Sequence, residues 1–141
     1  MKFKLSAIAL LAMISPGISS GQARAEMLTD AEAAFLSQLV TAAAVLEQRC
    51  TGYEANGAGG VQLGARLLGS TDAAMAMIGA FDAAIKAHDG QAYDTDKFRP
   101  EVFEAANRSF RQLRTNLINN PQSACADYGD AGAASGLLRR Y

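Results

Sequence analysis

The residues of this sequence that could do chemistry are few: one histidine, His88, and two cysteines, Cys50 and Cys125. Catalysis of the Ser-His-Asp or Cys-His type places a histidine beside an activated nucleophile. Asp89 follows His88 directly, but neighbouring side chains on a helix do not face each other. No other combination of acid, base and nucleophile stands out. The sequence therefore predicts a protein without enzymatic activity and without catalytic residues.

Metal sites need ligands that the sequence lacks. A structural zinc site takes four Cys or His ligands, whereas this chain has one His and two Cys. The acidic residues Asp94 and Asp96 resemble the start of a calcium loop, but Phe98 and Arg99 occupy positions that need an oxygen ligand and a glycine. We therefore expect neither a metal nor another cofactor.

His88 leaves one alternative open, a carrier of haem or of a metal ion. A bundle of helices can hold haem between a methionine and a histidine, and Met27, Met75 or Met77 could be the second ligand. Met75 and Met77 are two residues apart and point to nearly opposite sides of a helix, so both cannot bind one copper ion. The other role for His88 is structural, as a partly buried side chain or a cation at a helix end.

The beginning of the chain has the features of a secretory signal peptide. Lys2 and Lys4 precede an apolar run of ten residues (5–14), and the small residues Ala23 and Ala25 form a cleavage site. The run is shorter than the roughly 20 apolar residues that cross a membrane. We expect a cleaved signal over residues 1–25 and export of a soluble protein, which is either periplasmic or secreted.

The mature chain, residues 26–141, has the composition of one compact domain. Half of the whole sequence is hydrophobic and 19% is charged. Three of the 13 basic residues belong to the signal, which leaves 10 against 14 acidic residues and a net charge of −4. An acidic chain of this kind is a poor ligand for nucleic acid. We expect a single helical domain with no membrane span and no nucleic-acid partner.

Cys50 and Cys125 predict a disulfide. An oxidising compartment such as the periplasm favours pairing of an even number of cysteines, and two cysteines allow one intramolecular bond. Two free thiols, one of them reactive, are the alternative.

The first half of the mature chain has the periodicity of helices and no sustained alternation typical of strands. A first helix is expected from Thr29, where Thr29 and Glu32 form a capping box. The glycine-rich residues 51–60 predict a flexible loop, followed by a short helix over 61–68. The apolar stripe of the first helix consists of Leu36, Leu39, Ala43, Leu46 and Cys50.

Three further segments complete the expected fold. Ser70 or Thr71 caps a third helix that ends at Gly90, and Pro100 begins a fourth helix that ends before Pro121. The last helix starts there and is expected to become irregular around its glycines, Gly129, Gly132 and Gly136. Together these segments predict an all-α fold, a small bundle of four or five helices with one disulfide.

Arg108, Arg111 and Arg114 form a basic stripe on the expected fourth helix. Glu104 precedes Arg108 by four residues and is expected to pair with it. One interpretation is a solvated helix face whose acidic and basic side chains neutralise each other. The other is a docking surface for an acidic partner.

Two segments carry a resemblance to a known family. The first helix ends in Leu-Glu-Gln-Arg-Cys (46–50), and the C-terminal part has Cys125, Gly132 and Gly136 followed by Leu-Leu-Arg (137–139). In these segments the chain resembles an alphaproteobacterial family of short exported helical proteins, a domain of unknown function. The resemblance implies an exported helical domain with one disulfide and adds no activity or site residue.

The leading hypothesis is a non-enzymatic binding protein of the periplasm whose partner is another exported protein. Two alternatives stay open. One is a periplasmic chaperone activated by acid or stress, because residues 26–98 hold ten acidic and four basic side chains. The other is the carrier of a small ligand, haem or a metal ion, with His88 as its ligand.

Overall fold

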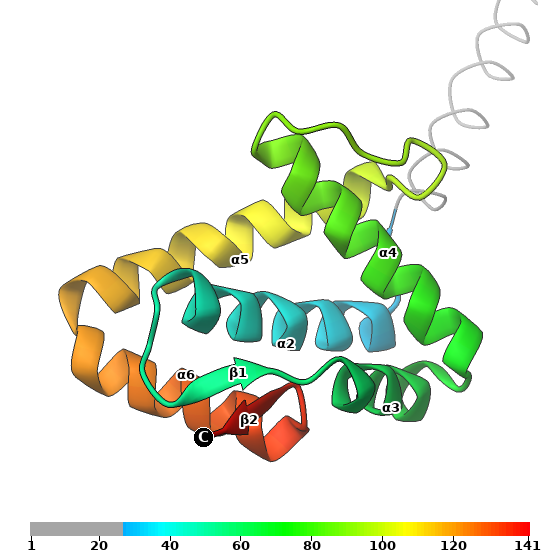
Figure 1. Ribbon diagram of the computed structural model, residues 1–141. Coiled ribbons are helices and arrows are strands. Elements are labelled where there is room, and N and C mark those ends of the chain that lie inside the picture. Colours follow the sequence, from blue (N-terminus) through cyan, green and yellow to red (C-terminus); the bar gives the residue numbers. More distant parts are fainter. Residues whose placement is uncertain (1–26) are drawn as a thin grey trace, which may run out of the picture.

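The computed structural model describes residues 27–141 (Figure 1). The predicted signal peptide, residues 1–25, lies outside the described residues. The described chain forms five helices and two short strands, none of the helices being long and apolar enough to cross a membrane. In chain order the elements are α2 (Asp30–Glu47), β1 (Tyr53–Ala55), α3 (Gly57–Leu68), α4 (Thr71–His88), α5 (Pro100–Asn119), α6 (Pro121–Ser135) and β2 (Leu138–Arg140). The predicted small helical bundle is confirmed.

Helix α2 lies in the middle of the fold, and the other four described helices all pack against it (Figure 1). Its side chains Phe35, Val40 and Val45 are fully buried. Helices α4 and α5 add Met77 and Val102 to the same core. A helix surrounded by other helices needs apolar residues on several faces, which explains why α2 is rich in apolar residues along its whole length.

Short-range signals set most helix ends where the sequence predicts them. The hydroxyl of Thr29 accepts a hydrogen bond from the Glu32 N–H (3.1 Å), and the Glu32 carboxylate accepts one from the Thr29 N–H (3.0 Å), so the capping box is confirmed. The Ser70 hydroxyl caps the first turn of α4. Pro100 and Pro121 begin α5 and α6, where the missing N–H of proline has no helical partner to lose.

The first helix is shorter than its apolar stripe predicted. Helix α2 ends at Glu47, and Arg49 adopts a left-handed φ of 55°. The N–H groups of Arg49 and Cys50 donate to the carbonyl oxygens of Leu46 and Val45, the hydrogen-bond pattern that more often ends in a glycine. Cys50 therefore lies just beyond the helix, and Leu46 is 37% exposed instead of belonging to the core.

The prediction of a flexible loop over 51–60 is wrong. Strand β1 lies within it, and α3 begins at Gly57, four residues earlier than expected. The Asn56 side chain caps α3 by accepting a hydrogen bond from the Gly59 N–H (3.2 Å). A side chain at Gly59 would collide with the carbonyl oxygen of Gly136. Glycine here permits two backbone segments to approach closely.

The prediction of irregular structure around Gly129 and Gly132 is also wrong, because α6 is a continuous helix through both. The ring of Tyr53 occupies the space that a side chain at Gly129 would need, and Leu138 does the same at Gly132. The helix ends at Gly136, whose φ is 88°. Only this last glycine interrupts the helix, because it alone adopts the left-handed conformation.

Strands β1 and β2 form a two-stranded antiparallel sheet in which Glu54 lies opposite Arg139. Each strand has three residues, too few for the alternation by which strands are recognised. Leu137 and Leu138 are buried at the start of β2 and attach the sheet to the core. The sheet was not predicted, and it brings the segment after Cys50 beside α6.

Candidate functional site

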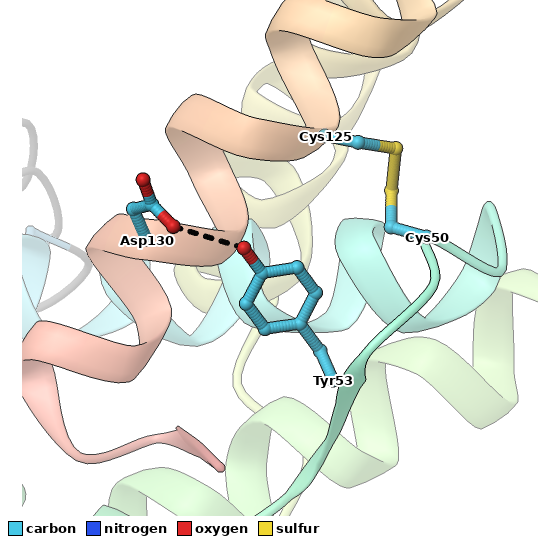
Figure 2. Close-up of a disulfide and its surroundings, with 4 residues drawn as sticks. All are labelled: Cys50, Tyr53, Cys125 and Asp130. Carbon is cyan, nitrogen blue, oxygen red and sulfur yellow. Dashed lines mark hydrogen bonds between the residues drawn. A yellow bond between two sulfur atoms is a disulfide. The ribbon is translucent and has the colours of Figure 1, made fainter. Parts of the chain in front are cut away.

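The predicted disulfide is present and joins Cys50 to Cys125 (Figure 2). It connects the segment after α2 to the fifth residue of α6, two positions that are 75 residues apart in the sequence. Cys50 is 8% exposed, whereas Cys125 is only partly buried. The covalent link is therefore reached more readily from the Cys125 side.

Both cysteines line an open pocket of about 430 Å³. Arg49 is the one charged residue among the described residues that line it, and its side chain makes no ion pair within residues 27–141. No local pattern indicated this pocket, because it forms where the end of α2 meets the start of α6. Its lining residues are Gln48, Arg49, Cys50, Thr51, Tyr53, Pro121, Gln122, Cys125 and Ala126.

Tyr53 reaches from β1 to α6 beside the disulfide, with its hydroxyl directed at Asp130 (Figure 2). The hydroxyl donates a hydrogen bond to Oδ1 of Asp130 (2.9 Å), and the Arg140 guanidinium donates another to the same oxygen (2.5 Å). The hydrogen bond to Asp130, together with desolvation and the carboxylate charge, raises the pKa of Tyr53. Tyr53 is thus a protonated donor that fastens β1 to α6.

His88 is the last residue of α4 and is exposed. Of the two predicted structural roles, the position at a helix end is the one observed. His88 lines a pocket of about 240 Å³ between α2, α4 and α5, together with Glu47, Asn107 and Arg114. Pockets for drug-sized ligands usually measure about 300–1,000 Å³, so this pocket suits a ligand smaller than those.

The methionines considered as partners of His88 lie in different environments. Met77 is buried in the core, whereas Met75 is 53% and Met27 70% exposed. Within residues 27–141, no group of three or more His, Cys, Asp or Glu side chains could hold a metal ion. No described cluster therefore offers a ready set of metal ligands around His88.

The three predicted docking arginines divide into two kinds. Arg114 is half-buried, pairs with Glu47 at 3.3 Å and lies over the Phe110 ring at 5.5 Å. Arg108 and Arg111 are exposed and make no ion pair with any residue the structure describes. Glu104 and Arg108 were expected to pair, but the described structure has no ion pair between them, so that prediction is wrong. Arg114 stabilises the packing of α5 on α2, while the other two face solvent.

A second charged cluster, formed by Arg99, Glu32 and Glu101, was missed in the sequence. The Arg99 guanidinium donates to Glu32 (2.7 Å) and to Glu101 (2.6 Å), so it joins the starts of α2 and α5. The hydrogen bond from Arg99 is the main cause that lowers the pKa of Glu32, against the opposing effect of burial. Because Arg99 and Glu32 are 67 residues apart, no local pattern could reveal the pair.

Comparison of the chain with protein-family models, with curated proteins and with solved structures found no match.

Proposed function

We propose that this protein is an exported, non-enzymatic binding protein that docks an acidic partner on the outer face of α5. The observation that carries the proposal is the exposure of Arg108 and Arg111 without an ion-pair partner in residues 27–141. Most other arginines of the described chain are neutralised by a carboxylate, as Arg99, Arg114, Arg139 and Arg140 are.

The rest of α5 is suited to present these two side chains. Its opposite face packs against α2 and α4 through Val102, Ala106, Phe110 and Leu117. A rigid helix loses little conformational freedom on binding. Unpaired cations on such a face attract an acidic surface at long range and suppress basic partners. The signal and the disulfide predict that this protein is exported to an oxidising compartment. The partner would be another exported protein of that compartment.

Reversing both charges, Arg108→Glu with Arg111→Glu, should weaken binding of the partner by at least about tenfold, because attraction becomes repulsion. The partner is first identified by crosslinking in the periplasm, and its affinity is then measured at low and high salt. The wild-type complex should weaken as salt rises. The double variant Arg66→Glu with Lys97→Glu, which makes the same charge change on other exposed positions, is the control. Equal affinities for both double variants would contradict the α5 site.

A second candidate function is a chaperone activated by acid, which the Arg99 cluster favours. Glu32 both completes the capping box of α2 and binds Arg99. Beside this pair lies a pocket of about 350 Å³ lined in part by Leu67, Leu68 and Met77. Protonation of Glu32 would break its ion pair with Arg99, which Glu101 would then hold alone. Loosening of this link between the starts of α2 and α5 would make the apolar surface accessible, which is the change that a client-binding protein would need.

The sign of the pH effect follows from the lowered pKa of Glu32. A carboxyl whose folded pKa lies below its unfolded value of 4.5 stabilises the fold above that value and ceases to do so as the pH falls through the folded pKa. The free energy of unfolding of the wild-type protein should therefore fall as the pH drops from about 4.5 through the folded pKa of Glu32. Glu32→Gln, which keeps a side chain able to complete the cap, should lose about 1–2 kcal/mol at neutral pH and show a flatter acid profile in urea titrations.

The chaperone function is tested with the same variant. Wild-type protein should suppress aggregation of an acid-denatured client only below about pH 4, near the pKa of carboxyl groups, and Glu32→Gln should shift that onset toward neutral pH. Asp30→Asn removes an exposed carboxylate from the same turn and should leave the onset unchanged. If wild-type protein suppresses no aggregation at acid pH, this second function is ruled out.

A further inference from the structure

The disulfide of this protein lies in a setting that differs from that of a fully buried structural bond. Cys125 is partly exposed, and the pocket of about 430 Å³ that both cysteines line is open to solvent. An attacking thiolate can therefore approach the Cys125 sulfur from outside. Attack there would expel Cys50 as the leaving thiolate.

The charges around the bond favour thiolates. Arg49 is the one charged side chain among the described residues lining the pocket, and no acidic residue lines it. Arg49 would attract the incoming thiolate and stabilise the departing Cys50 thiolate, and a leaving thiol of lower pKa departs faster.

Other contacts hold the same segments together when the bond is open. Tyr53 and Arg140 both bind Asp130 of α6. Strand β1 is paired with β2, and Leu137 and Leu138 anchor β2 in the core. Cleavage of the disulfide thus leaves β1 attached to α6 and does not require the chain to unfold.

We propose that the Cys50–Cys125 disulfide is a thiol–disulfide exchange site that a protein dithiol opens in the folded state. One thiolate of the dithiol attacks Sγ of Cys125, a mixed disulfide forms, and Cys50 leaves as a thiolate. The second thiolate of the dithiol then attacks its own sulfur in the mixed disulfide and releases Cys125. The partner ends as a disulfide, and this protein gains two electrons and, on protonation of its thiolates, two protons. This site is separate from the α5 face and does not depend on the function proposed there.

The test measures how fast the oxidised protein is reduced at neutral pH without denaturant, by alkylation of the new thiols and mass measurement. The reductants are dithiothreitol, glutathione, and a purified Cys-x-x-Cys protein. We expect the rate to rise in proportion to dithiol concentration and to exceed the rate of global unfolding, with the Cys-x-x-Cys protein faster than dithiothreitol at equal concentration. A rate that is independent of dithiol concentration and equal to the unfolding rate would overturn the proposal. Reduction by small thiols without reduction by the protein dithiol would also overturn it.

Arg49 provides a variant that leaves the bond intact. Arg49→Gln should slow reduction of the folded protein by about tenfold through the loss of thiolate stabilisation, while the far-UV spectrum and the urea midpoint stay near those of wild type. Arg66→Gln, which changes an exposed residue of α3, is the matched control. Its disulfide should be reduced at the wild-type rate. Equal rates for wild type, Arg49→Gln and Arg66→Gln would contradict a positively charged exchange site.

Discussion

Replacing both cysteines, Cys50→Ala with Cys125→Ala, will lower the free energy of unfolding by about 4 kcal/mol, because the unfolded chain regains the freedom that a long closed loop denies it. The two cysteines are 75 residues apart, and in the chain-entropy account a loop of this size stabilises by about 4–4.5 kcal/mol. The measurement is urea unfolding at neutral pH. The slope of the free energy with urea should rise as well, since an unlinked unfolded chain exposes more surface.

The control for this prediction is the wild-type protein in excess reductant, which should unfold at the same urea concentration as the double variant. A loss below about 1 kcal/mol would show that residual structure in the unfolded chain already restricts these segments. The outcome also bears on the exchange proposal. A typical domain is stable by about 5–15 kcal/mol, so a loss of about 4 kcal/mol leaves a folded reduced form, as exchange in the folded state requires.

Phe35→Ala will destabilise the protein by about 3–5 kcal/mol, the usual range for removing a buried phenylalanine ring. Phe35 lies in the first half of α2 and is 0% exposed. Its ring lies so close to Gly64 of α3 that a Cβ there would be 2.6 Å from Cζ of Phe35 and equally close to Cβ of Ala74. The cavity left by the ring therefore has neighbours from three helices, which cannot all collapse into it.

Urea unfolding of Phe35→Ala, compared with Tyr93→Ala, tests this prediction. Tyr93 is 39% exposed in the segment between α4 and α5 and should lose less than about 1.5 kcal/mol on truncation. Equal losses for the two variants would mean that α2 is not the centre of the core. A loss at Phe35 near the upper limit would show that α3 and α4 hold their positions when the ring is gone.

Local signals account for what could be predicted of the helices. The Thr29–Glu32 capping box, the Ser70 cap and the prolines at 100 and 121 act within one helical turn, so the sequence reveals them directly. The disulfide could be predicted for a different reason, since two cysteines permit one pairing. The basic stripe on α5 was visible from its spacing, although its division into one packed and two free arginines was not.

The glycines show where local interpretation fails. Gly59, Gly129 and Gly132 looked like helix breakers, but they lie within helices and admit the backbone of Gly136 and the side chains of Tyr53 and Leu138. A glycine that permits close approach cannot be told from one that permits flexibility until the neighbouring segment is known. The sheet escaped prediction for the same reason, because three-residue strands are stabilised by partners far along the chain.

The helical class of the fold, the starts of most helices and the pairing of the cysteines could be predicted from the sequence alone. Each depends on interactions within a few residues or on a simple count. Only the folded chain shows that Arg99 binds Glu32 and that Tyr53 binds Asp130. It also shows that Arg49 is the charged residue lining the pocket at the disulfide. These contacts join residues that are far apart in the chain. They exist only once α2 is enclosed by the other helices, and burial rather than local propensity determines which side chains meet.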